Sequence, residues 1–325
     1  MLNIPAQHYQ PPSPDLWRGR ADSLPGERYF QLVECVDLRQ QEIAPAQSTT
    51  VGLIGFCSDT GIVRNLGRPG AAQGPNALRS ALAKLAAPAS SLKILDYGNI
   101  LCVDDDLETA QKNLALVVAE LVQKKIKPLV LGGGHETAWG HYQGLAQGKA
   151  DQGLGIINFD AHFDLRALPA SNQGTSGTPF RQIALARQAL QQPFSYFCLG
   201  IQTFANTKSL FATAAELGVE YIMADTIHLQ PLANYLAKLD AFLQTQQAIY
   251  VTLCLDVFAN TIAPGVSAPQ PLGLQPWQVI ALLRHVLQSK KVISFDVVEL
   301  SPPLDPNGCT VQLAANLVAE YLAAF

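Results

Sequence analysis

Short runs of apolar residues alternate with longer segments of helical period along most of the chain. Eight such runs begin at Val51, Leu92, Lys127, Leu154, Ser195, Val219, Ile249 and Val292. Most of them are apolar at nearly every position, as expected of strands buried on both faces of a sheet. Between the runs, residues 76–87, 107–125 and 276–291 have the spacing of helices. This order predicts a three-layer α/β fold with a central parallel sheet of about eight strands flanked by helices.

The first fifty residues do not follow this repeat. They are rich in proline and glutamine, and they contain one candidate strand or helix near YFQLVECVDL, at residues 29–38. We interpret residues 1–50 as an arm that packs on the main domain. No linker, sequence repeat or low-complexity tract divides residues 51–325, so the sequence predicts a single α/β domain there.

Composition narrows the class of protein. The chain has 325 residues, of which 48% are hydrophobic, yet no apolar run approaches the roughly 18 residues of a membrane span. Its start lacks the pattern of a signal peptide. A net charge of −4 without a basic cluster disfavours nucleic acid and anionic membranes as partners. Six cysteines without a Cys-x-x-Cys pair indicate reduced thiols, and we expect a cytoplasmic protein.

The stretch DAHFD places Asp160, His162 and Asp164 at alternate positions directly after the apolar run LGIINF. Side chains at alternate positions of an extended chain point to one side, so these three can converge on one point. Carboxylate and imidazole donors suit Mn, Zn or Fe, and the dominance of carboxylates favours Mn. The alternative is a polar loop whose acids bond backbone amides and whose histidine is satisfied locally.

Further polar residues follow other predicted strands. His135 comes after a glycine-rich turn that follows KPLVL, Asp256 ends the run IYVTLCLD, and Glu299 follows VISFDVV. Because the carboxyl ends of parallel strands meet at one edge of a sheet, these residues should gather with DAHFD. The sequence therefore predicts a metal site, large enough for two ions that share a bridging hydroxide. A phosphate site is disfavoured, since GGGHETAWG lacks the lysine and spacing of a P-loop.

Four stretches occur in the order and spacing of the ureohydrolase superfamily, which includes arginases, agmatinases and formimidoylglutamases. They are GGGHETAWG, NFDAHFDLR, LDVFANTIAPGVSAP and FDVVELSPPLD, and GRPGAAQGPNALR fits as well. The resemblance covers roughly residues 50–325. It implies an arginase-like fold, two Mn²⁺ ions, and a bridging hydroxide that attacks the central carbon of a guanidine or formimino group.

The resemblance also implies roles for single residues. The implied metal ligands are His135, Asp160, His162, Asp164 and Asp256, with Asp160 bridging the ions. Glu299 stands where the superfamily holds the cationic nitrogen end of the substrate. A carboxylate suits that place because a buried amidinium needs a fixed counter-charge.

One position departs from the superfamily pattern. Its members usually carry Asp-x-Asp at the end of the seventh strand, whereas this chain reads TLCLDVF, with Cys254 in the first place. As a thiolate, Cys254 could coordinate, although sulfur suits Zn or Fe better than Mn. If Cys254 instead stays neutral, one ion is weakly held or absent. That alternative motivates a rival hypothesis, a metal-poor binding module on the same fold.

Two features resemble formimidoylglutamases in particular. Arg166 follows the ligand run and could hold a substrate carboxylate through two parallel bonds; Arg68 and Arg181 are weaker candidates. The loop SGTPFRQ carries Ser176 and Gly177 where arginases have a His-Gly pair.

In the same loop, Ser176 and Thr178 could bond the polar end of the substrate, or could cap a helix that opens at Pro179. Together with Arg166 they favour Mn-dependent hydrolysis of N-formimidoyl-L-glutamate, a dicarboxylate amidine, to L-glutamate and formamide, a step in histidine degradation. Another guanidino hydrolase, arginase- or agmatinase-like, is the alternative within the enzymes. The superfamily is often oligomeric, but no motif here predicts a symmetry.

Overall fold

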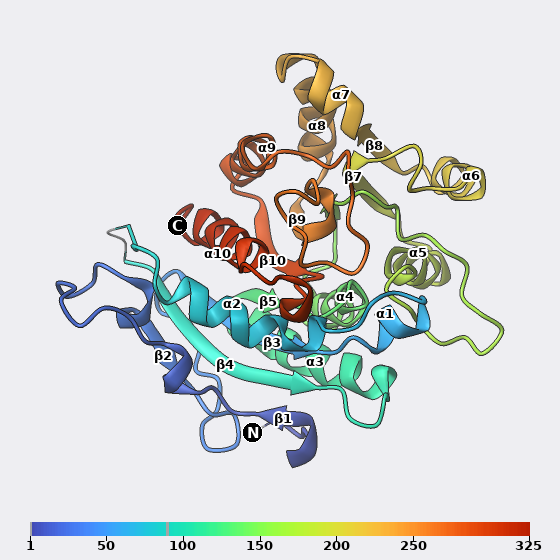
Figure 1. Cartoon of the computed structure of the whole chain (residues 1–325). Helices are drawn as coiled ribbons and strands as arrows, with labels where there is room; N and C mark the ends of the chain where they lie inside the picture. Colours follow the sequence, from blue (N-terminus) through green and yellow to red (C-terminus); the bar gives the residue numbers. More distant parts are fainter. Residues whose placement is uncertain (1, 89–90) are drawn as a thin grey trace.

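A computed structural model describes residues 2–88 and 91–325 (Figure 1). Within these residues the strands are β1 (Tyr9–Gln10), β2 (Val33–Cys35), β3 (Thr50–Cys57), β4 (Lys93–Leu101), β5 (Lys127–Leu131), β6 (Leu154–Phe159), β7 (Ser195–Ile201), β8 (Glu220–Met223), β9 (Ala248–Cys254) and β10 (Val292–Val298). They form one sheet in the order β1-β4-β3-β5-β10-β9-β6-β7-β8, and β2 also pairs with β4. Among these strands β1 alone runs antiparallel to its neighbour.

Helices cover both faces of this sheet. They are α1 (Thr60–Arg64), α2 (Gly74–Leu82), α3 (Leu107–Gln123), α4 (Thr137–Gln147), α5 (Pro179–Ala189), α6 (Lys208–Glu216), α7 (Ala224–Leu229), α8 (Ala233–Thr245), α9 (Pro276–Gln288) and α10 (Cys309–Leu322). Short 3₁₀ turns cover η1 (Ala6–His8), η2 (Pro14–Leu16), η3 (Tyr29–Gln31), η4 (Ala71–Gln73), η5 (Leu255–Val257) and η6 (Pro302–Leu304). Apolar residues of α2 and α7–α10 pack in one core cluster and those of α3–α6 in a second.

The alternation of strand side chains explains why there are two cores. In β6, Ile157 and Phe159 belong to the cluster with α2 and α7–α10, whereas Ile156 belongs to the cluster with α3–α6. Successive side chains of a strand point to opposite faces, so an unbroken apolar run supplies both cores at once. The predicted α/β fold is confirmed, and all eight predicted strands are present. None of the helices in the described ranges combines the length and hydrophobicity needed to cross a bilayer.

The sheet is larger than predicted because the N-terminal segment adds β1 and β2 at one edge. Gly98, in β4, has a φ of +80°, and a Cβ there would lie 2.2 Å from the carbonyl oxygen of Gln10. Glycine therefore allows the backbone of β1 to approach β4 closely. Nearby, Trp17 donates from Nε1 to Asp96 at 2.8 Å, and Trp17 lies in the core with α2. The division of the chain at residue 50 stays a prediction.

Candidate functional site

Four adjacent strands bring the predicted ligands to one edge of the sheet. In the order β5-β10-β9-β6, His135 follows β5, Glu299 follows β10, Cys254 ends β9 and Asp160 follows β6. Asp256 lies in η5, directly beyond β9. All five residues are at most 5% exposed. The residues that the sequence placed at separate strand ends thus meet in one buried cluster.

The glycines before His135 serve the turn that leaves β5. A Cβ at Gly133 would lie 1.8 Å from the carbonyl oxygen of Ser58, which follows β3. Only a residue without a Cβ lets the turn pack this closely against the neighbouring backbone. The glycine-rich stretch therefore places His135 at the sheet edge.

Each histidine of the cluster lies between two carboxylates. Nδ1 of His135 is 2.9 Å from an oxygen of Asp160 and 2.9 Å from an oxygen of Asp164. Nδ1 of His162 is 3.3 Å from the other oxygen of Asp160 and 3.1 Å from Asp256. Asp160 therefore joins the two histidines through its two oxygens.

These donors fit a divalent metal ion. Nδ1 of His135 is buried and, despite its short distances to the carboxylates, makes no hydrogen bond of acceptable geometry within the described residues. Oδ1 of Asp256 is likewise buried without a partner among them. Buried polar atoms are normally paired, and a cation between nitrogen and carboxylate donors would satisfy both atoms.

The electrostatics also favour a cation. Burial and the charge of Asp160 raise the pKa of Asp164, and the same causes raise the pKa of Asp256 to about 6. Burial, with Glu136 and Asp256 nearby, raises the pKa of Glu299 well above its ordinary range. Buried carboxylates this close together repel one another unless positive charge is present. A divalent ion would supply that charge.

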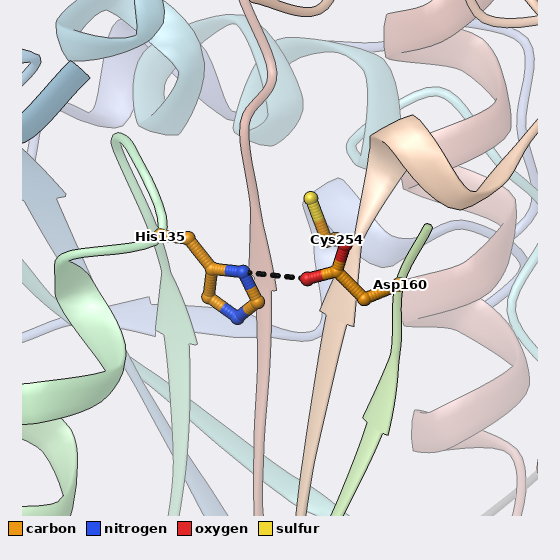
Figure 2. Close-up of side chains that lie close together, drawn as sticks. All are labelled: His135, Asp160 and Cys254. Carbon is orange, nitrogen blue, oxygen red and sulfur yellow. Dashed lines mark ion pairs between the residues drawn. The ribbon is translucent and has the colours of Figure 1, made fainter. Parts of the chain in front are cut away.

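Two groups of three residues have donor atoms close enough to hold an ion. His135, Asp160 and Cys254 form one group and Asp160, His162 and Asp256 form the other, with the donor atoms of each group within 4.8 Å of one another. Figure 2 shows the first group, whose side chains come from three separate segments and lie close together. Burial and the surrounding carboxylates, Asp160 first, raise the pKa of the Cys254 thiol well above its ordinary range.

Two buried side chains beneath the cluster hold its ligands, and sequence reasoning missed both. Thr252 bonds Nε2 of His135 through its hydroxyl at 3.0 Å, and Asn158 donates to Asp160 at 3.1 Å. Asn158 also donates to the Tyr196 hydroxyl at 2.9 Å. Both residues lie two positions before a predicted ligand position on the same strand, so they face the same side of the sheet. This spacing of two residues could have identified both side chains from the sequence.

Two predicted site residues have left-handed backbone conformations. The φ angle of Asp164 is +49° and that of Glu299 is +70°. Residues other than glycine seldom adopt this region, and such conformations are concentrated at functional sites. Glu299 directly follows β10, whereas Asp164 follows a bend at residues 161–162, so DAHFD is not extended as the alternate spacing assumed. Both residues turn their side chains toward the cluster, where they meet His135.

A cavity of about 310 Å³ opens above the ligands. Arg166 and Ser176 line it together with Asn65, Asp256 and Glu299. Arg166 is exposed, and within residues 2–88 and 91–325 its guanidinium makes no ion pair or hydrogen bond. Asn65, which sequence reasoning did not select, donates to the Ser176 hydroxyl at 3.2 Å.

The other residues that the sequence predicted to bind substrate are not available to a ligand in this cavity. The Thr178 hydroxyl donates to the carbonyl of Thr175 at 3.0 Å, and Thr178 does not line this cavity. Arg68 reaches the cavity, but its guanidinium donates to the carbonyl oxygens of Val266 and Ser267 at 2.7 and 3.0 Å. Arg181, in α5, does not line the cavity. Arg166 is therefore the arginine of this set that is available to a ligand.

Comparisons with known proteins identify the family and the fold of the chain. The profile of the Arginase family matches residues 49–324. The formimidoylglutamase of Legionella pneumophila (strain Philadelphia 1) is 47% identical over 316 residues, 97% of this chain and 97% of that protein. The structure of Bacillus subtilis formimidoylglutamase has the same fold, with a TM-score of 0.79 at 24% identity over 94% of this chain and 95% of that one. Trypanosoma cruzi formiminoglutamase, solved with Mn²⁺, gives a TM-score of 0.77 at 25% identity over 86% and 95%.

Proposed function

The chain belongs to the arginase family, and we propose that it hydrolyses N-formimidoyl-L-glutamate to L-glutamate and formamide in histidine degradation. The observation that carries this proposal is that relatives matching nearly the whole chain are named formimidoylglutamase. The cavity beside the ligand cluster supports the same substrate, because it combines a buried acid with a free arginine.

We propose that the cluster holds two divalent ions, with manganese as the expected ion. The ligands would be His135, Asp160, His162, Asp164 and Asp256, with Cys254 as a further donor. Ions bound in this way lower the pKa of a shared water and supply a nucleophile at neutral pH. Asp160, whose two oxygens face the two histidines, is the natural ligand to contact both ions.

Glu299 would orient the formimino group. One of its oxygens accepts a hydrogen bond from the backbone N–H of His135 at 2.9 Å, which fixes the carboxyl group at the cavity floor. The other oxygen is then the acceptor for a substrate N–H. A cationic amidinium beside this buried acid would form a charge-assisted hydrogen bond, stronger than one between neutral groups.

Arg166 would bind a carboxylate at the other end of the substrate. Its backbone N–H donates to the carbonyl oxygen of Gly177 at 2.9 Å, and a Cβ at Gly177 would lie 2.9 Å from Cδ of Arg166. Glycine thus lets the arginine side chain cross the loop toward the cavity. Ser176 and Asn65 would add hydroxyl and amide donors to the same end.

A substrate panel tests the proposal. The Mn-loaded chain is expected to release formamide from N-formimidoyl-L-glutamate and to turn over arginine, agmatine and guanidino acids far more slowly, since these lack the second carboxylate that Arg166 would hold or carry a different nitrogen end. Faster turnover of a guanidino substrate would assign the chain to another activity of the family. No turnover of any substrate by a chain that binds both ions would favour a binding module.

A further inference from the structure

The two halves of the ligand cluster differ in one atom type. The half around His135 contains one imidazole nitrogen, the carboxylates of Asp160 and Asp164, and the sulfur of Cys254. The half around His162 contains one imidazole nitrogen and the carboxylates of Asp160 and Asp256. Cys254 also interacts with Asp256, but its sulfur groups with the donor atoms of His135 and Asp160, so sulfur distinguishes that half from the other.

The position of Cys254 is fixed by the sheet. It is the last residue of β9, where its backbone is in register with Val298 of β10. Thr252, two residues earlier on the same side of the strand, contacts His135, so this side of β9 faces the cluster. With 1% of its surface exposed, Cys254 is buried, and it lines the cavity together with the other ligands. Its sulfur stays beside His135 and Asp160, as Figure 2 shows.

Sulfur changes which ion is preferred more than whether an ion binds. A thiolate and a carboxylate carry the same formal charge, so Cys254 can offer as much negative charge as an aspartate would. Thiolate is a soft ligand that favours zinc and similar ions, whereas oxygen ligands suit manganese. The buried Nδ1 of His135, which lacks a well-formed hydrogen bond among the described residues, directs a second borderline donor at the same place.

We propose that Cys254 makes the two ion positions unequal: the half with His135, Asp164 and Cys254 prefers a zinc-class ion, Zn²⁺ or Co²⁺, over Mn²⁺. The half with His162 and Asp256 keeps a nitrogen and oxygen donor set that accepts Mn²⁺. This inference rests on the proposed function only in placing both ions in this cluster.

Cobalt reports directly on the sulfur. The full-length chain is stripped of metal with a chelator and titrated with Co²⁺ alone while its ultraviolet and visible spectrum is recorded. We expect a thiolate-to-cobalt charge-transfer band in the near ultraviolet, which oxygen and nitrogen ligands do not give. The band should disappear in Cys254→Ser and Cys254→Asp, and should persist in Cys309→Ser, which removes an exposed thiol outside the cluster.

Competition between ions gives a second readout. The stripped chain is loaded with equal concentrations of Zn²⁺ and Mn²⁺, freed of excess, and measured by elemental analysis. Because Zn²⁺ outcompetes Mn²⁺ at nitrogen and oxygen sites as well, the competition is repeated with an increasing excess of Mn²⁺. Cys254→Asp should exchange its zinc for manganese at an excess about 10- to 100-fold lower than the natural chain requires. Thermal melting of each variant identifies any that fails to fold, and Cys254→Ser, the smaller change, then carries the test.

Each outcome decides between the alternatives. A cobalt spectrum without the band, a band that survives Cys254→Ser, or two manganese ions per natural chain in the competition at equal concentrations would overturn the inference. If such a chain still hydrolysed N-formimidoyl-L-glutamate, the proposed function would stand without the inference. If the chain shows the cobalt band but hydrolyses none of the substrates in the panel, the inference stands and the proposed function is contradicted.

Discussion

The imidazole of His135 is oriented by a hydrogen bond between its Nε2 and the hydroxyl of Thr252. Thr252 lies 3.0 Å from Nε2 and is fully buried, so a proton on Nε2 leaves the lone pair of Nδ1 directed at the cluster. Replacing Thr252 with valine keeps the shape of the side chain and removes this bond. We expect Thr252→Val to weaken Mn²⁺ binding by about 10- to 100-fold in a calorimetric titration.

Two further variants separate orientation of the imidazole from general damage. Thr252→Ser retains the hydroxyl and should restore most of the affinity for Mn²⁺, whereas Thr203→Val, at an exposed loop position, should leave it unchanged. Equal losses of affinity in the serine and valine variants would show that the hydroxyl of Thr252 does not orient His135.

Arg166 lines the cavity, and its guanidinium has no partner of its own among the described residues. A hydrogen bond to a charged group contributes about 1.5–3 kcal/mol, so Arg166→Ala should lower kcat/KM for N-formimidoyl-L-glutamate by about 10- to 100-fold. Because the substrate carboxylate is held equally in ground and transition states, most of the loss should fall on KM. Steady-state kinetics of Arg166→Ala measure this change, and Arg181→Ala, which alters an arginine outside the cavity, is the control. Equal changes of KM in the two variants would show that Arg166 does not bind the substrate carboxylate.

Among single residues, the sequence predicted those whose polar side chains differ from the apolar residues next to them. His135, the DAHFD run and Asp256 are polar groups at the ends of apolar runs, and the structure brings all of them together. Thr252 and Asn158 lie inside such runs and read as ordinary strand residues. Asn65 lies in a loop, 111 positions from Ser176, and only the folded chain brings the two into contact.

Among the elements, the strand β4 is tied to α2 and to the N-terminal segment by one buried carboxylate. Asp96 accepts two hydrogen bonds from Arg79, at 2.8 and 2.9 Å, and one from Trp17. Asp96→Asn leaves the Arg79 charge buried without its counter-charge. We expect the variant to lose about 3–5 kcal/mol of the free energy of unfolding, measured by urea titration.

A surface acid provides the matched control for Asp96. Asp15 pairs with Arg18, and both side chains are about three-quarters exposed. Asp15→Asn should change the urea midpoint little, because water screens an exposed ion pair. If both asparagine variants unfolded at the midpoint of the natural chain, Asp96 would not anchor these elements.

The strands illustrate why some elements are predictable and others are not. Seven of the eight predicted strands are buried on both faces, so each is an apolar run that is visible without knowledge of its partners. The eighth, β8, lies at an end of the sheet and is only partly buried. The strand β1 spans two residues, too few to form a pattern. The strand β2 spans three residues inside the stretch 29–38, for which the sequence left strand and helix open. Their pairing depends on Gly98 and on the cluster around Asp96, which are contacts of the folded chain.

For the whole molecule, the ligand cluster is a buried concentration of acids that links four central strands. Without an ion, burial and the charge of Asp160 raise the pKa of Asp256 to about 6. Burial, with Glu136 and Asp256 nearby, raises the pKa of Glu299 well above its ordinary range, so these carboxylates destabilise the folded chain when they are ionised. A divalent ion that binds the folded chain and not the unfolded one stabilises it in proportion to the logarithm of its concentration. Metal removal should therefore lower the melting temperature.

The size of that effect follows from mass action. At a free Mn²⁺ concentration 100 times its Kd, the stripped chain should gain about 2.7 kcal/mol of unfolding free energy from one site. Scanning calorimetry with chelator, with Mn²⁺ and with Mg²⁺ measures the gain, and Mg²⁺, which retains its waters, should give little. Asp160→Asn should abolish most of the Mn²⁺ gain, because Asp160 contributes to both groups of ligands. An equal gain in Asp160→Asn would mean that Mn²⁺ stabilises the chain elsewhere, and the cluster would then lose its assignment as the metal centre.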